Sequence, residues 1–389
     1  MSVVIDGIDW ADQTRTDRIT AYMVCPTALA QTWGSIDGVV LDGSKVSYAY
    51  YSDTRVSGTL VVHGTGWRRG SFVRIVHSIP GTSYSRELGT FIVTDDGGSR
   101  GHGSWDYSLT LHSALYGLST DVDPMPHTIK QGRSLHEDAR WMLGGRPYRD
   151  AVTVDASYDA DYAQEGGNNW LRRFAEVCDD AGIRYSVDGH GRILMANYVA
   201  PAKRTERFSL DPRDPRGICH DDLSVSTDWL RMAGRVTLHY KGQRKVEDGV
   251  YKRNGTIHKK GETKYKNEDV EFAAAAEVTS GHASRGVRGY IVTDYHSVDD
   301  MSPQTQDRAN EMAREFLAQD SVEDVEWQLT TQYVPVREGD VGRLYVPDGY
   351  GEYTGWRKVM VKSCDVDLGR MQCRLTLKSA SSNDVEEMQ

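Results

Sequence analysis

The stretch of this chain that decides its fold is Glu87–Leu118, which reads ELGTFIVTDDGGSRGHGSWDYSLTLHSALYGL. It contains two apolar segments separated by an acidic, glycine-rich turn. In the second segment the side chains alternate in character, with one face formed by Trp105, Tyr107, Leu109 and Leu111 and the other by Asp106, Ser108, Thr110 and His112. A period of two is typical of a half-buried strand. The stretch therefore predicts two antiparallel strands, with one face toward a core and the other toward water or a partner.

Similar short runs, separated by Gly, Asp, Ser and Pro, occur throughout the first third of the chain. They are Val46–Tyr51, Gly58–Val62, Phe72–Ile79, Leu88–Val93 and Trp105–Leu111. Regularly spaced strands with turn signals between them are typical of a barrel or a sandwich. We therefore expect residues 1–119 to form an N-terminal, barrel-like β domain.

The middle of the chain has a helical pattern instead. Ser134 and Glu137 form a capping box at the start of a short apolar helix. A second helix is expected over residues 169–181, with Gly182 just past its end. These elements predict a small α/β domain over residues 120–215.

β structure returns after the proline-rich linker at residues 211–215. The alternation of Val325–Tyr333 predicts a strand. One helix is expected over residues 303–319, with Ser302 as its cap and an apolar stripe that should lie on a sheet. We therefore expect residues 216–389 to form a second β-rich domain.

Two segments of this last domain are not expected to join a core. Lys241–Asp269 carries interleaved positive and negative charges and almost no apolar residues. This composition favours a solvated excursion over a nucleic-acid patch, with an inter-subunit arm as the alternative. The end of the chain, residues 379–387, has the composition of a flexible tail.

The order of these elements resembles that of hub proteins from phage tail tips. These are minor tail proteins of long-tailed phages, related in fold to the baseplate hub of contractile tails. The resemblance is carried by Glu87–Leu118 together with Val56–Leu60, Trp67–Ile75, Pro126–Lys130 and Glu338–Leu344. It implies a mainly β fold with an α+β insert, in which two β-barrel-like hub domains flank a small α/β domain.

The two β regions also echo each other. Gly89–Asp95 and Gly289–Asp294 each begin with glycine, continue as an aromatic-containing strand and end in Thr-Asp. The resemblance implies two similar barrels per chain, and a trimer would then present six near-equivalent barrels to a sixfold tail ring.

Length and charge restrict the function further. With 389 residues, the chain exceeds what one core usually serves, so two or three domains are expected. A net charge of −10 disfavours attachment to nucleic acid, whereas an acidic wall would let DNA slide past. Five scattered cysteines fit a reducing cytosol without disulfides. The N-terminal residues predict no signal peptide, and no apolar run is long enough to predict a membrane segment.

Several motifs imitate catalytic signatures without the context that these need. Gly97–Gly101 satisfies the G-x-S-x-G pattern of hydrolases, but the segment that follows reads as a strand where a helix is required, which favours a hairpin loop. His136 begins a motif like that of zinc proteases, yet Arg140 stands where the second metal-binding histidine belongs. Neither motif predicts an active site.

Other patterns are equally incomplete. The glycine pairs Gly64/Gly66 and Gly349/Gly351 look like dinucleotide loops whose third glycine is misplaced. Asp155, Asp159 and Asp161 resemble a calcium loop but are followed by Gln164 at the position that needs glycine. Cys219–Asp222 groups metal-capable side chains without a second cluster. We therefore predict no catalytic residue, no cofactor and no metal site.

The resemblance implies a structural virion protein that is not an enzyme. It would be a tail-tip hub, assembled in the host cytoplasm as a ring, and the expected ring is a homotrimer. The ring would join the hexameric distal tail ring to the tip, contact the tape measure protein and receptor-binding proteins, and surround the DNA exit path. Two alternatives are a receptor- or glycan-binding tail protein, whose surface Trp and Tyr would stack on sugars, and a cell-wall polysaccharide hydrolase.

Overall fold

The structure is a computed structural model. It describes residues 4–5, 7–12, 14–64, 67–101, 104–122, 127–130, 132–153, 156–158, 162–164, 167–216, 218–227, 232–247, 252–253, 256–257, 265–280, 283–300, 306–321, 325–349 and 353–380. These residues divide into two compact units. The first takes its residues from Met1–Ser226 and Glu326–Ser381, and the second consists of the described part of Thr227–Val325.

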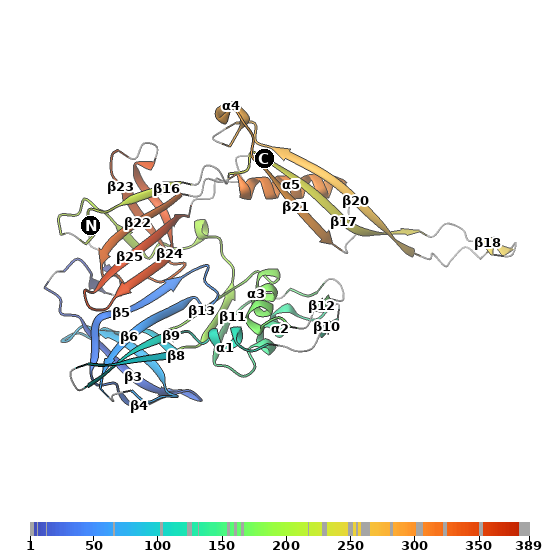
Figure 1. Cartoon of the computed structure of the whole chain (residues 1–389). Helices are drawn as coiled ribbons and strands as arrows, with labels where there is room; N and C mark the ends of the chain where they lie inside the picture. Colours follow the sequence, from blue (N-terminus) through green and yellow to red (C-terminus); the bar gives the residue numbers. More distant parts are fainter. Residues whose placement is uncertain are drawn as a thin grey trace. The chain divides into compact units, whose positions relative to one another are not determined.

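Seven strands of the N-terminal part form one half of a large sheet in the first unit (Figure 1). They are β3 (Arg18–Cys25), β4 (Ala28–Ser35), β5 (Val39–Ala49), β6 (Val56–His63), β7 (Phe72–Ser78), β8 (Ser85–Gly101) and β9 (Ser104–His112). The long β8 contributes to two pairings, because its first half pairs with β7 and its second half with β9. The strand pair predicted from the sequence is therefore confirmed. A separate short pair precedes it, β1 (Val4–Ile5) with β2 (Ile8–Asp9).

Only part of β9 shows the burial of one face that its alternating sequence predicts. Leu109 and Leu111 are fully buried. Trp105, on the same face, is 47% exposed. The reason is that the register with β6 ends at the pair His63↔Asp106, so that β6 offers Trp105 no opposite residue. The expectation that this face is buried is correct for the leucines and wrong for Trp105.

Strands of the C-terminal part complete the same sheet. They are β15 (Phe208–Leu210), β16 (Ser224–Thr227), β22 (Val325–Gln332), β23 (Val341–Val346), β24 (Gly355–Asp367) and β25 (Gln372–Ser379). β24 joins the two halves, because its residues Ser363–Asp367 pair antiparallel with Lys45–Ala49 of β5. The strand predicted at Val325–Tyr333 is confirmed as β22.

The order of the sheet is β16-β22-β25-β24-β5-β6-β9-β8-β7-β3-β4, with β23 paired to both β24 and β15. The mainly β fold class predicted from the sequence is confirmed. Among the described strands, however, this path begins at β16 and ends at β4 without closing a barrel.

The middle of the chain forms a small α/β part of the first unit. Its elements are α1 (Tyr116–Ser119), β10 (His127–Ile129), α2 (Leu135–Met142), β11 (Tyr148–Ala151), β12 (Tyr162–Gln164), α3 (Trp170–Asp180), β13 (Ile183–Val187), β14 (Ile193–Asn197) and the 3-10 turn η1 (Pro201–Lys203). Both helix starts are capped, since Ser134 Oγ accepts from Glu137 N at 3.0 Å and Asn169 Oδ1 accepts from Arg172 N at 2.8 Å. Gly182 has a φ of +61°, which suits the position after α3. Both predicted helices are confirmed.

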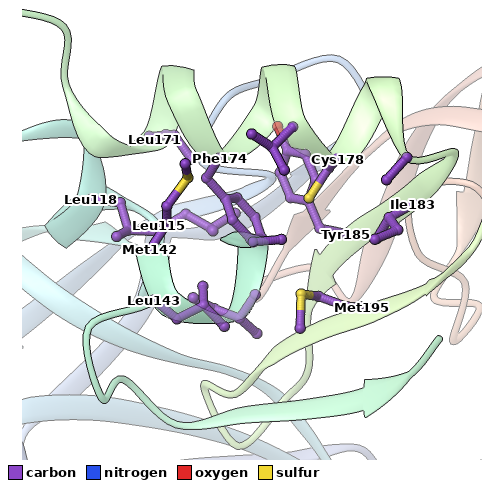
Figure 2. Packing of buried hydrophobic residues seen from close by; sticks show 14 of the residues in the cluster. Leu115, Leu118, Met142, Leu143, Leu171, Phe174, Cys178, Ile183, Tyr185 and Met195 are labelled. Carbon is purple, nitrogen blue, oxygen red and sulfur yellow. The ribbon is translucent and has the colours of Figure 1, made fainter. Parts of the chain in front are cut away.

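An apolar core holds this α/β part together (Figure 2). Figure 2 shows Phe174 and Cys178 of α3 pointing toward Tyr185 and Met195 of the adjacent strands, with Met142 at the end of α2 nearby. The sheet is mixed, because β14 pairs parallel with β11 and antiparallel with β13. This core packs α2 and α3 against β13 and β14.

The second unit is a three-stranded sheet with one long helix packed on it. Its strands are β17 (Arg235–Glu247), β20 (Tyr265–Glu277) and β21 (Thr293–Asp300), in the order β20-β17-β21. The helix is α5 (Gln306–Asp320), and Ala309 and Ala313 on it contact Leu238 and Ala274 of the sheet. This confirms the predicted helix and its stripe, whereas Ser302 and Pro303 lie outside the described residues.

The charged segment of this unit contains regular β structure. β17 and β20 continue into it and pair as far as Glu247↔Tyr265 (Figure 1), and a short hairpin of β18 (Lys252–Arg253) and β19 (Thr256–Ile257) follows. The segment Lys241–Asp269, expected from its composition to be a solvated excursion or an inter-subunit arm, consists in its described part of paired strands, because backbone pairing needs no apolar side chains.

The two segments with similar sequences, Gly89–Asp95 and Gly289–Asp294, do not have a common structure. Gly89–Asp95 lies wholly within β8. Gly289 ends the short helix α4 (Arg285–Arg288) with a φ of +74°, and only Thr293 and Asp294 of its segment belong to a strand.

Candidate functional site

The catalytic motifs tested in the sequence do not assemble into a site. Gly97–Gly101 belongs to β8, and its Ser99 pairs with Asp106 in the ladder to β9. The pattern is therefore part of a regular strand pair and not a loop. His136 on α2 contacts Asp150 through Nε2 at 2.8 Å, and Arg140 lies over the ring of Tyr148. The first motif belongs to the large sheet, and the second serves local packing of the insert.

The metal-capable residues are equally dispersed. Within the described ranges no group of three or more His, Cys, Asp or Glu is placed to hold a metal ion. Cys219 is buried beside Thr331, and Asp222 Oδ1 accepts from Thr330 N at 2.8 Å, so this cluster attaches the linker to β22. Asp155, Asp159 and Asp161 lie outside the described residues, as do Gly66 and Gly351.

One open cavity of about 490 Å³ lies in the first unit, lined by Asp9, Ala11, Asp12, Pro215 and Arg216. Arg216 donates to Asp9 at 3.0 Å and to Asp214 at 2.6 Å. The side chains of Arg216, Asp9 and Asp214 at this cavity are thus bonded to one another. The lining contains no nucleophile beside a base, which an active site of the usual kinds would need.

The most unusual buried group is Glu338, in the segment between β22 and β23. Only 4% of it is exposed, and its Oε2 has no hydrogen-bond partner among the described residues. Burial raises the pKa of Glu338 to about 7, although Arg337 and Arg184 oppose the shift. Asp340 adds to the rise. Sequence reasoning missed this site, because the run Glu338–Leu344 reads as a polar turn.

Arginines around Glu338 connect three parts of the first unit. Arg337 Nη2 donates to the carbonyl of Glu87 in β8 at 2.6 Å, and Arg184 of β13 donates to the carbonyl of Glu338 at 3.0 Å. Arg204 donates to the carbonyl of Gly339 at 2.9 Å. Guanidinium groups that bind buried carbonyls satisfy them and fix the geometry. The large sheet, the insert and the segment before β23 are therefore held as one frame.

Two groups on the surface of the first unit combine exposed or half-buried aromatic rings with charged side chains. Trp141 and Trp356 are also exposed, beside Trp170 and Tyr345 respectively. The first group, here called the tryptophan patch, consists of Trp33, Trp67, Arg68, Trp105 and Tyr107. Its members contact one another: Arg68 lies 5.4 Å from the ring centre of Trp33, Trp67 lies 6.2 Å from Tyr107, and Tyr107 lies 6.4 Å from Trp105.

The second group, here called the tyrosine patch, consists of Tyr51, Asp179, Asp180, Tyr198 and Val199. Tyr51 is 60% exposed and Tyr198 52% exposed. Tyr198 N donates to the carbonyl of Gly182 at 2.7 Å, which places it beside the end of α3 where the two aspartates lie. The sequence indicated a supply of interface aromatics but could not indicate which of them are exposed.

The fold of this chain is similar to the folds of solved phage tail proteins. The chain has 10% identity and a TM-score of 0.61 to a tail protein from Neisseria meningitidis, over 93% of this chain and 96% of that one. It has 12% identity and a TM-score of 0.59 to a 43 kDa prophage tail protein from Shewanella oneidensis, over 94% and 99%.

A third similar structure is a chain of the Francisella PdpA-VgrG complex, with 9% identity and a TM-score of 0.52. The match covers 96% of this chain and 59% of that one. No protein-family model and no curated protein matches the sequence. At these identities the likeness establishes the fold, which is that of phage tail proteins.

No helix among the described residues combines the length and the apolar character needed to cross a membrane.

Proposed function

We propose that this chain is a structural component of a phage tail, namely the tail-tip or baseplate hub. The observation that carries the proposal is the agreement of fold with two phage tail proteins over more than 90% of both chains. Several of its largest side chains are exposed, as expected for a subunit whose surfaces are covered on assembly.

In the proposed assembly, copies of the chain form a ring, a homotrimer, at the tip of the virion tail. The ring joins the hexameric distal tail ring to the tip, contacts the tape measure and receptor-binding proteins, and surrounds the path by which DNA leaves. A net charge of −10 suits a wall that DNA passes without adhering. Two barrel-like hub domains, the three-part division at residues 119 and 215, and assembly in the host cytoplasm stay predictions of this proposal.

The proposal is tested by the symmetry of the purified full-length chain. Mass photometry should give a species of three times the 43.5 kDa chain mass, alone or on addition of the distal tail protein, and negative-stain images should show a ring. A chain that stays monomeric in both conditions and does not bind the distal tail ring would refute the proposal.

A second candidate function is glycan binding by a tail protein. It is favoured by the rings of Trp105 and Tyr107, which lie nearly parallel at an interplanar angle of 20° on an exposed face. Sugar rings stack on such surfaces. Binding of the monomer to a glycan array that is lost on the substitution Trp105→Ala would support this function. Trp105 and Tyr107 would then serve sugar binding and would not be needed for assembly of the subunits.

A further inference from the structure

We propose that the tryptophan patch of one copy docks on the tyrosine patch of the next copy and that this head-to-tail contact closes the ring. The inference rests on the proposed hub function and names the surfaces through which its subunits meet.

The tryptophan patch has the composition of an interface centre. Trp33 and Trp105 are 42% and 47% exposed, although both are large apolar side chains. Tyr107 lies against Gly98 of β8, where a Cβ atom would be 3.3 Å from the tyrosine ring, so the glycine lets the ring lie close to the sheet. Trp, Tyr and Arg are the residues that most often dominate binding energy at protein interfaces.

The tyrosine patch is another exposed apolar surface of the same unit. Val199, 45% exposed, follows Tyr198 directly. The guanidinium of Arg204 lies 5.7 Å from the ring centre of Tyr198, and the ammonium of Lys378 lies 6.0 Å from that of Tyr51. These cations help to orient the two rings, and the side chains stay more than half exposed.

Charges distinguish the two patches and make them complementary. Arg68 is exposed and has no carboxylate partner among the described residues. Asp180 is exposed and has no cationic partner among them, and besides burial the negative charges of Asp179 and Glu176 raise its pKa. An arginine supplied by another copy would relieve this repulsion.

The positions of the patches decide the type of contact. They lie at opposite ends of β6. At its C-terminal end, Gly64 N donates to the carbonyl of Trp105, and at its N-terminal end Ala49 N donates to the carbonyl of Arg55, next to Tyr51. An eight-residue strand spans about 23 Å. Two different, complementary patches at opposite ends of a rigid strand produce a heterologous contact, which forms a ring where its rotation closes.

The experiment uses the full-length chain in four charge variants, with mass photometry and sedimentation velocity as readouts. Arg68→Glu and Asp180→Arg are each expected to weaken self-association at least about tenfold, which is the loss of about 1.4 kcal/mol per interface. The double variant R68E/D180R should restore the ring, because it exchanges the two charges. Arg370→Glu, the same charge change at an exposed turn outside both patches, is the matched control and should assemble like the unmodified chain.

Trp105→Ser tests the apolar part of the contact independently and should also give monomers. The urea midpoint of each variant shows that it is folded. If the unmodified chain forms rings that all of these variants also form, the patches are not the interface, while the hub function stands. If each single charge variant is monomeric but the double variant is not restored, the two residues do not face each other and the pairing is refuted. A monomeric unmodified chain would refute the hub function itself.

Discussion

The substitution Glu338→Gln should change how the stability of the first unit depends on pH. Glu338 is 4% exposed, and burial raises its pKa from 4.5 to about 7. The folded state therefore binds the proton more tightly than the unfolded state does. The contribution of Glu338 to stability is fully present below the unfolded pKa and is lost as pH rises through about 7. Above about pH 7 the contribution of Glu338 no longer changes with pH.

The size of the effect follows from the shift. The rise of this pKa from 4.5 to about 7 corresponds to about 3.5 kcal/mol, at about 1.4 kcal/mol for each step of one in pKa, and partial relaxation of the site would reduce it. Glutamine is nearly isosteric and stays neutral, so the variant does not lose this energy on ionisation. Relative to the unmodified chain, the variant should gain up to about 2.5 kcal/mol between pH 5 and pH 8, because part of the effect lies below pH 5.

Urea unfolding followed by tryptophan fluorescence at four pH values between 5 and 8 measures this difference, since the buried Trp10 and Trp327 lie in the first unit. Glu206→Gln removes an exposed carboxylate that pairs with Arg343 and serves as the control, with an expected change within about 0.5 kcal/mol at every pH. A difference between the Glu338 variant and the unmodified chain that does not vary with pH, or that falls as pH rises, would show that Glu338 ionises normally.

Three further substitutions probe the frame. Gly58→Ala should destabilise the first unit by more than about 2 kcal/mol in urea unfolding, because the new Cβ would lie 2.6 Å from the backbone oxygen of Lys45, and an equal midpoint would show that β5 can yield. Ser134→Ala should cost about 1 kcal/mol through loss of the cap on α2, with Thr retaining most of it. Burial alone would raise the pKa of Asp17, but hydrogen bonds from His77 and Arg15 outweigh it and lower that pKa. Asp17→Asn should therefore lower the free energy of unfolding at neutral pH. The unmodified chain should lose stability as pH falls below about 4, and the variant should not. Equal pH dependence of the two chains in urea unfolding would show that the pKa of Asp17 is not lowered.

Local features of the fold could be predicted from the sequence, because their cause lies within a few residues. The cap at Ser134 and the alternation of β9 are both visible in short windows, and both are confirmed by the structure. Amphipathic spacing likewise predicted that α5 lies on a sheet. For β9 and α5, the apolar residues recur every two or about every four positions, which indicates the face that becomes buried.

Long-range features could not be predicted in this way. The pair Val46↔Val366 joins positions 320 residues apart, and no window of sequence contains both. The exposure of Trp105 depends on where its partner strand β6 ends, and the environment of the buried Glu338 depends on Arg184 of β13 and on the Glu87 carbonyl of β8, which binds the adjacent Arg337. The extension of β17 and β20 could not be predicted from the sequence, because a run of mixed charges lacks the apolar alternation that indicates a strand.

The junction of β24 with β5 also dictates an order of events during synthesis. The edge of β5 that receives residues 363–367 must wait until nearly the whole chain has left the ribosome. The second unit, whose described strands and helix contact one another, is made before that moment and can fold within the gap. Its early folding shortens the distance that the unfolded chain must search to join the two halves of the sheet. The insertion thus acts as a folding aid for the sheet that encloses it in the sequence.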